Sequence, residues 1–283
     1  MIRVGLSGFG DHEELYGNGV RASERLKAYS AYFGVVELDN SFYAVQPVRN
    51  YLKWLSETPH GFQFVIKAYQ GMTGHLRGEK NYFDSDEAMF AAFHTSIQPV
   101  IEEQRLSMVL FQYPPWFECN QKNVAILRKT RERMGDVPCA VEFRNQTWYT
   151  PETREKTLAF LSKQQWIHTI ADEPQAGMGS IPIVLGVTTP DKTLIRLHGR
   201  NVSGWHKSSD PDWRKLRYLY RYNMIELSEW RDRLRELEKS CETLYVMFNN
   251  NSGGDAADNA KQLISLLGEG DQGLAPRQLD LFE

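Results

Sequence analysis

The sequence predicts an α/β protein: a single TIM-like (β/α) barrel domain of parallel strands, followed by a flexible C-terminal tail. Short runs rich in β-branched and aromatic residues alternate with longer stretches of helical periodicity, as in chains built from β-α units. There are eight such runs, the number of units that closes into a barrel. The 283 residues, 41% of them hydrophobic, supply enough material for one large core. A doubly wound open sheet is the main alternative.

The predicted strands are apolar runs dominated by Val, Ile, Leu and Phe. This composition is typical of parallel strands that are buried on both faces. In chain order they cover residues 2–7, 34–38, 62–68, 106–112, 138–143, 166–172, 193–199 and 243–250.

Helical stretches lie between most of these strands, with apolar residues at three- and four-residue intervals among Glu, Lys, Arg and Ala. One has a clear start signal, because Thr150 precedes Pro151 and Glu152. In the sixth unit, residues 173–192 indicate a long loop rather than a full helix. The helices are predicted over 21–33, 86–104, 121–134, 151–164 and 227–242, and a last one begins within 249–260.

Composition limits the classes of function. The net charge of −3 argues against a basic surface that binds nucleic acid without sequence preference. Three widely spaced cysteines, Cys119, Cys139 and Cys241, indicate reduced thiols and no zinc module. The N-terminus lacks the basic start and long apolar run of a signal peptide. No apolar stretch approaches the about 18 residues of a membrane helix. We therefore expect a soluble, cytoplasmic protein.

Polar side chains stand at the ends of the predicted strands, whereas the strand interiors are apolar. Taken singly, each is more often a solvated surface residue. In a barrel, however, the carboxyl ends of all strands meet at one face, where functional residues gather. The candidate catalytic residues are Glu37, Glu142 and His198. The candidate substrate-binding residues are Lys67, His75, Gln112, Arg144, Trp148, Arg196, Asn249 and Asn250.

Two pairs in this set are spaced two residues apart, Glu142 with Arg144 and Arg196 with His198, so both members of a pair face the same side of a strand. A carboxylate that faces into a barrel is costly unless it is paired, so we expect Glu37 and Glu142 to contact cations. The cations at neighbouring strand ends are Lys67, Arg144 and Arg196. Such a site suits a small anionic or phosphate-bearing ligand, held by Arg and Lys, with Glu or His moving a proton.

The sequence does not identify a cofactor. A divalent metal is an alternative, but no H-x-H or H-E-x-x-H spacing supports one, and no metal ligands are assigned. The permissible ligands are His75, His198, Glu37, Glu142 and Asp172. Backbone amides within 249–260 could receive an anion at the start of the last helix, although Asp255 could equally cap that helix.

Six motifs in chain order give the chain a resemblance to the YecE-like family, also called domain of unknown function seventy-two. They are ELDNSFY (37–43), TPHGFQFVIKA (58–68), LFQYPPWF (110–117), VEFRNQTW (141–148), RLHGRN (196–201) and FNNNSGGDAADNA (248–260). The resemblance covers nearly the whole chain and implies a TIM-like barrel, but no settled activity. Asp39 departs from the Asn that many members have there, which adds a carboxylate to the site.

Three classes of function fit these observations. The first is an enzyme acting on a phosphate-bearing substrate, such as a phosphodiester in damaged or branched nucleic acid; this would be a hydrolase of phosphoesters or phosphodiesters. The second is a glycoside-processing enzyme that uses Glu37 and Glu142 as its paired carboxylates. The third is a non-catalytic binding or adaptor protein, and the fold does not discriminate among the three.

The barrel domain is expected to span residues 1–268, and the tail 269–283 ends in the peptide QLDLF. This peptide resembles the motif with which bacterial replication and repair proteins bind the DNA sliding clamp. The resemblance assigns a polar contact to Gln278 and apolar contacts to Leu281 and Phe282, with Leu279 beside them. The alternative is that these apolar residues fold back and seal the barrel. The sequence thus favours a nucleic-acid-related barrel enzyme with a partner-binding tail, and the glycoside-processing and adaptor alternatives stay open.

Overall fold

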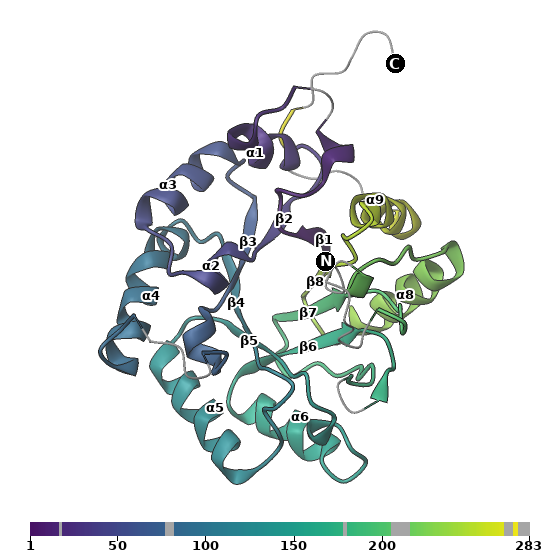
Figure 1. Cartoon of the computed structure of the whole chain (residues 1–283). Helices are drawn as coiled ribbons and strands as arrows, with labels where there is room; N and C mark the ends of the chain where they lie inside the picture. The colour runs from purple at the N-terminus through teal and green to yellow at the C-terminus, as the bar shows by residue number, and fades with distance from the viewer. Residues whose placement is uncertain (17–18, 77–81, 178–179, 205–215, 269–273, 277–283) are drawn as a thin grey trace.

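The computed structural model describes residues 1–16, 19–76, 82–177, 180–204, 216–268 and 274–276. Eight strands pair in chain order, all in parallel, and close into one barrel at the centre of the molecule (Figure 1). The predicted TIM-like barrel is confirmed. The strands are β1 (Ile2–Ser7), β2 (Val35–Leu38), β3 (Gln63–Lys67), β4 (Leu106–Gln112), β5 (Cys139–Glu142), β6 (Trp166–Asp172), β7 (Lys192–Leu197) and β8 (Thr243–Phe248).

Helices form a ring outside the strands (Figure 1). The α-helices are α1 (Arg25–Tyr29), α2 (Asn40–Tyr43), α3 (Val48–Glu57), α4 (Asp86–Glu102), α5 (Gln121–Met134), α6 (Arg154–Lys163), α8 (Met224–Leu237) and α9 (Asp255–Leu267). Two 3-10 turns, η3 (Gln70–Thr73) and η4 (Gln146–Trp148), follow β3 and β5. In the described part of 173–191, between β6 and β7, no α-helix occurs, in agreement with the predicted loop.

The first predicted helix is shorter than expected. The sequence predicts one helix over 21–33. The structure instead has a 3-10 turn over Ala22–Glu24, followed by α1, which is only five residues long. Ser30 ends α1, and its hydroxyl donates a hydrogen bond to the carbonyl of Lys27 at 2.8 Å. Serine commonly competes with helical hydrogen bonding in this way. The helical pattern in the sequence therefore overstates the length of α1.

The barrel interior is layered. Its lower part is an apolar cluster separate from the core between strands and helices, and its members face inward from seven of the strands. They are Val35, Val65, Met108, Leu110, Ala140, Ile167, Leu194, Tyr245 and Met247. Side chains two positions further along a strand face the same side and lie nearer the carboxyl end. On six strands those positions hold the polar residues Glu37, Lys67, Gln112, Glu142, Arg196 and Asn249. The apolar layer thus forms the floor of a polar site at the mouth of the barrel.

Residues 274–276 lie beside α1 (Figure 1), where the amide of Ala275 donates to the carbonyl of Ser30 at 3.0 Å. The predicted partner-binding residues Gln278, Leu279, Leu281 and Phe282 lie outside the described residues, so their alternatives stay open. Among the helices that the structure describes, none is long and apolar enough to cross a membrane.

Candidate functional site

The mouth network is a set of ionic and polar side chains at the carboxyl ends of the strands. Most of the predicted site residues belong to it, and they come together from strands far apart in the sequence. We use this name for Glu37, Asp39, Lys67, Gln112, Glu142, Arg144, Glu173, Arg196, His198 and Asn249.

Arg196 lies at the centre of this network and is fully buried. Its Nε and Nη2 donate to the two carboxylate oxygens of Glu37 at 2.8 and 2.5 Å. Its Nη1 donates to Oε2 of Glu142 at 2.7 Å. One guanidinium therefore links carboxylates from β2 and β5 across the barrel, and the expectation that Glu37 and Glu142 pair with cations is confirmed.

Arg144 forms a second layer nearer the opening. Its Nε lies 2.6 Å from Oε1 of Glu142, and its Nη1 donates to Oε2 of Glu173 at 2.5 Å. Its Nη2 lies 3.1 Å from Nε2 of His198. Planar guanidinium groups with several partners are held in one orientation, so the two arginines fix the positions of their carboxylates.

Glu142 is saturated with donors. Besides the two arginines, Nε2 of Gln112 donates to its Oε1 at 2.7 Å. Burial opposes ionisation, but the cations around this carboxylate outweigh burial and hold the pKa of Glu142 well below its usual value. Burial raises the pKa of Glu37, although Arg196 acts against that rise. A carboxylate whose two oxygens are both held by arginine is poorly placed to take a proton from a substrate, so we assign Glu37 and Glu142 to positioning.

His198 is neutral at physiological pH. Burial, followed by the charge of Arg144, lowers the pKa of His198 to about 3. Its Nε2 lies 3.1 and 3.4 Å from the guanidinium nitrogens of Arg144 and Arg196, and 3.4 Å from Oε1 of Glu142. Its Nδ1 lies 2.9 Å from the amide of Asn249. Both ring nitrogens are thereby engaged inside the network, and His198 fits a positioning role better than proton transfer.

Glu173 is the functional candidate that the sequence reasoning missed, although it stands directly after the sixth predicted strand. It is 1% exposed, accepts from Arg144, and also accepts from the amide of Ile181 at 2.7 Å. Its neighbour Asp172 faces outward, where Trp230 donates to it at 2.7 Å. Burial raises the pKa of Glu173 to about 7, which is the range that general acid–base catalysis requires near neutral pH.

The raised pKa of Glu173 predicts a pH-dependent change in stability. Ionisation costs more in the folded state than in the unfolded chain, so the contribution of Glu173 is full below pH 4.5 and falls as pH rises to about 7. The loss amounts to about 3 kcal/mol. Glu173→Gln lacks this titration. As pH rises, wild type therefore loses about 3 kcal/mol of unfolding free energy relative to the variant. Urea unfolding between pH 4.5 and 8 measures it.

Glu102→Gln, on the exposed face of α4, is the control for loss of a carboxylate. A difference between wild type and Glu173→Gln that stays constant over the whole pH range contradicts the assignment, because it means that Glu173 ionises as it does in the unfolded chain.

Lys67 lies at the edge of the network. Its Nζ is 3.1 Å from Asp39 and 4.9 Å from the centroid of the Phe42 ring. No other acceptor among the described residues is recorded for this ammonium, which has three N–H donors. Burial, followed by the charges of Lys67 and Arg144, lowers the pKa of His75 to about 4. The charges of both cations therefore reach His75.

Two predicted site residues lie elsewhere. Trp148 is 1% exposed, stacks on Phe143 with ring centroids 4.0 Å apart, and donates to the carbonyl of Phe117 at 2.7 Å. Asn250 is buried and donates to Tyr220 and Asn259. Neither contacts the mouth network in the described structure, so the substrate-binding role predicted for them is replaced by packing and loop fixation.

The buried hydroxyl of Ser7, at the end of β1, belongs to the same face of the barrel. It has no hydrogen-bond partner among the described residues, and Ser7 pairs in register with Glu37. A buried hydroxyl without a partner is unusual in a folded protein and indicates a group that a ligand can satisfy. Among the described residues, no group of three or more His, Cys, Asp or Glu side chains is arranged to hold a metal ion.

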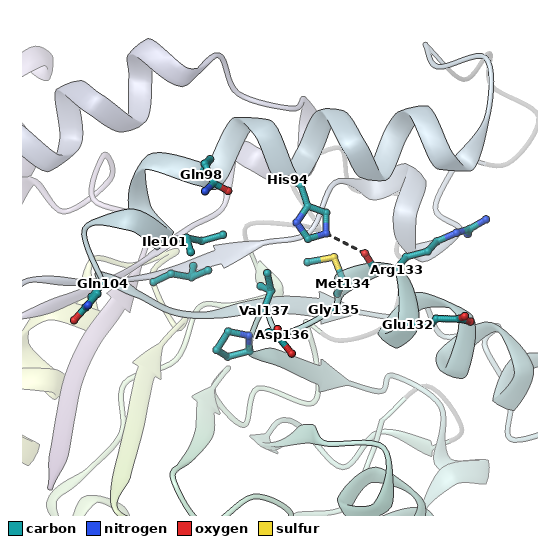
Figure 2. Close-up of a pocket in the computed structure, with 12 residues that line it drawn as sticks. His94, Gln98, Ile101, Gln104, Glu132, Arg133, Met134, Gly135, Asp136 and Val137 are labelled. Carbon is teal, nitrogen blue, oxygen red and sulfur yellow. Dashed lines mark hydrogen bonds between the residues drawn. The ribbon is translucent and has the colours of Figure 1, made fainter.

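A separate hollow lies at the opposite end of the barrel. It measures about 560 Å³ and lies between the carboxyl ends of α4 and α5, as Figure 2 shows. His94 spans it and contacts the carbonyl of Arg133 at 3.0 Å. This hollow opens where β4 and β5 begin, whereas barrel enzymes carry their sites where strands end. None of the predicted site residues lies there, so the mouth network remains the candidate site.

Comparison with known proteins agrees with this architecture. The family model described as "Protein of unknown function DUF72" matches residues 3–280. The chain is 55% identical to UPF0759 protein YunF of Bacillus subtilis strain 168 over 283 residues, with full coverage of both chains. The crystal structure of a DUF72 family protein from Enterococcus faecalis V583 is 37% identical, covers 99% of this chain and 100% of that one, and has a TM-score of 0.92.

A second crystal structure, of a DUF72 family protein from Thermotoga maritima MSB8, is 34% identical, covers 95% of this chain and 100% of that one, and has a TM-score of 0.81. The six motifs, the closed barrel and these relatives lead to one conclusion: the chain belongs to the DUF72 family.

Proposed function

We propose that this barrel is an enzyme that acts on a phosphate-bearing substrate at its mouth. The observation that carries the proposal is the concentration of cations there, of which Arg144 and Arg196 are buried and Lys67 is partly buried. These cations, Lys67, Arg144 and Arg196, lie among carboxylates. One of the carboxylates, Glu173, has its pKa raised to about 7 and is therefore partly protonated at neutral pH. The cations are accompanied by carboxylates, so an anion with several oxygens is received by the groups that keep N–H donors to spare, Lys67 above all.

Each group has a distinct role in this proposal. Lys67 and Arg144 contact the phosphate oxygens, because Lys67 has donors to spare and Arg144 lies in the layer nearest the opening. Arg196 holds Glu37 and Glu142 and thereby orients Arg144 from below. Water attacks the phosphorus atom, and protonated Glu173 gives its proton to the leaving ester oxygen as the phosphoester bond breaks. The hydroxyl of Ser7 offers one further hydrogen bond to the substrate.

The glycoside-processing alternative receives less support. It requires one carboxylic acid and one carboxylate, each free to act on the glycosidic bond. Glu37 and Glu142 instead share Arg196, and both oxygens of each accept from cations. The adaptor alternative is favoured if the protein binds phosphate but turns over no phosphoester.

Release of nitrophenol tests the proposal. Purified protein is incubated with p-nitrophenyl phosphate and with bis-p-nitrophenyl phosphate, with and without added Mg²⁺ or Zn²⁺. We expect turnover of at least one ester, and a loss of about 100-fold or more in kcat for Glu173→Gln, the range for removal of a general acid or base. Glu102→Gln is expected to keep full activity. No turnover of either ester, together with normal binding of inorganic phosphate, favours a binding protein and contradicts an enzyme.

A second proposal concerns the tail: we propose that its QLDLF peptide, residues 278–282, binds the DNA sliding clamp. Residues 274–276 make the last described contact with the barrel, at Ser30, and the peptide follows directly. Short segments that order on binding depend on a few apolar anchors, here Leu281 and Phe282. Recruitment of this kind raises the local concentration of an enzyme at DNA without a basic surface.

Binding of the full chain to purified clamp, measured by surface plasmon resonance, tests the tail. We expect Phe282→Ala to eliminate binding and to leave the melting temperature unchanged, whereas Arg277→Ala, next to the peptide, keeps most of the binding. A lowered melting temperature in Phe282→Ala, with no clamp binding by wild type, indicates instead that the tail seals the barrel.

A further inference from the structure

A strip of aromatic rings crosses the rim of the barrel beside the mouth network. The ring of Tyr43 contacts that of Phe42, with centroids 5.3 Å apart, and Phe42 contacts His75 at 5.0 Å. His75 in turn contacts Trp116 at 5.9 Å. Both ends of the strip are open to solvent, since Tyr43 is 70% and Trp116 44% exposed. The rings meet edge to face, with interplanar angles of 89°, 83° and 66°, so the exposed rings at the two ends are the ones on which a planar group can stack.

The strip borders the proposed anion site directly. Nζ of Lys67 lies 4.9 Å from the centroid of the Phe42 ring, so one cation serves both the phosphate position and the strip. A ligand whose phosphate lies at Lys67 therefore has aromatic surface within reach of the group attached to that phosphate.

A groove continues from the far end of the strip. It measures about 500 Å³, and its walls include Trp116, Phe117 and the turn at Thr73–Gly74, next to His75. The groove is also lined by α5, which contributes Lys122 and Lys129, and by Asp86, which is paired with Arg133. The groove thus extends the mouth site outward with both aromatic and cationic side chains.

The two lysines are available to a ligand. They are exposed, stand seven residues apart on one face of α5, and form no ion pair with any residue that the structure describes. Arg133, further along the groove, is by contrast already paired with Asp86 and Glu87 at 3.0 and 2.5 Å. Anionic groups beyond the mouth would therefore meet Lys122 and Lys129.

We propose that the strip and the groove bind single-stranded nucleic acid. This inference rests on the proposed function and names its substrate class. One phosphate occupies the mouth at Lys67, bases stack on Tyr43 and Trp116, and the neighbouring phosphates contact Lys122 and Lys129. A sugar phosphate would fill only the mouth. In a nucleic-acid strand, flat bases alternate with anionic phosphates, and this alternation matches the aromatic and cationic side chains along the strip and the groove.

The charge of the chain sets the expected salt dependence. Because the net charge is −3, long-range attraction between the protein and a polyanion contributes little to binding. The arrangement proposed above contacts about three phosphates, at Lys67, Lys122 and Lys129. For a single strand this predicts a slope of about −2 in log K against log salt concentration, far shallower than for proteins with many phosphate contacts.

The test is fluorescence anisotropy with 5′-labelled deca-deoxythymidylate and deca-uridylate, with thymidine monophosphate, ribose 5-phosphate and inorganic phosphate as unlabelled competitors. We expect at least one decamer to bind 10-fold or more tightly than any competitor, and the better decamer identifies the preferred sugar. Trp116→Ala is expected to weaken decamer binding about 10-fold, and Trp116→Phe less, without effect on phosphate binding. The double variant Lys122→Gln/Lys129→Gln should reduce the salt slope by about 1.4.

Matched controls are Leu52→Ala, an exposed apolar side chain on α3, and Lys156→Gln/Lys163→Gln, two exposed lysines seven residues apart on α6. Decamers that bind no more tightly than ribose 5-phosphate, or a Trp116→Ala variant that binds them as wild type does, overturn this inference and leave the proposed function standing if phosphate still binds. Absence of both phosphate and decamer binding removes the proposed function as well.

Discussion

Replacement of Arg196 by Met is expected to lower the free energy of unfolding by about 3–5 kcal/mol, the cost of leaving buried carboxylates without their cation. Arg196 is fully buried and is the partner of both Glu37 and Glu142. Arg196→Lys should recover little, because one ammonium cannot reproduce the planar contacts with both carboxylates. Urea unfolding at pH 7 measures the loss.

The control is Arg133→Met, which also removes an arginine that bridges two carboxylates. Its partners Asp86 and Glu87 have side chains 57% and 72% exposed, and exposed ion pairs contribute about 0–1 kcal/mol. The loss in Arg196→Met should also be smaller at pH 4.5, where the abandoned carboxylates can take protons. Equal losses for the two variants contradict the central place given to Arg196.

Replacement of Lys67 by Met is expected to weaken binding of phosphate-bearing ligands by about 10- to 100-fold, the range for loss of a hydrogen bond to a charged group. The fold should tolerate this change, because among the described residues Lys67 forms an ion pair with Asp39 alone, whose side chain is 38% exposed. The inhibition constant of inorganic phosphate, or its dissociation constant, measures the effect, and the melting temperature reports on folding.

Lys53→Met is the matched control, since Lys53 pairs with Glu57 on α3 as Lys67 pairs with Asp39 at the mouth. Phosphate binding by Lys67→Met that equals wild type removes Lys67 from the proposed site. A melting temperature far below that of Lys53→Met shows instead that Lys67 is chiefly structural.

The barrel could be predicted from the sequence because parallel strands buried on both faces leave a clear signal. All eight strands occur within about two residues of their predicted bounds, as for Gln63–Lys67 against 62–68. The residues that line the mouth can also be predicted from the sequence, because Glu142 shares a strand face with Arg144, and Arg196 shares one with His198. Spacing alone shows which side chains can meet when a barrel closes.

What sequence could not give was the facing of residues at the very end of a strand. Asn249 joins the mouth network, but Asn250, one position on, packs against Asn259. Glu173 faces Arg144, whereas its neighbour Asp172 faces Trp230. Alternation continues past the last strand residue in both cases, but only the closed sheet shows which of two neighbouring polar residues faces the barrel interior.

Trp148 was misplaced for a different reason. Aromatic residues in loops after strands serve either packing or ligand stacking, and composition does not distinguish the two. In the structure the ring is covered by Phe143 and Phe117, while Trp116, one motif earlier, is exposed on the rim. Exposure at the mouth is a property of the fold that a single sequence does not record.

The most direct test of the account is calorimetric titration of inorganic phosphate into the wild-type protein and Lys67→Met at pH 7, in buffers of different ionisation enthalpy. We predict one phosphate per chain in wild type, with proton uptake because anion binding favours protonated Glu173, whose pKa is about 7 without ligand. Lys67→Met should bind at least 10-fold more weakly. No phosphate binding by wild type at millimolar concentration, or equal binding by the two proteins, would contradict an anion site at the mouth of the barrel.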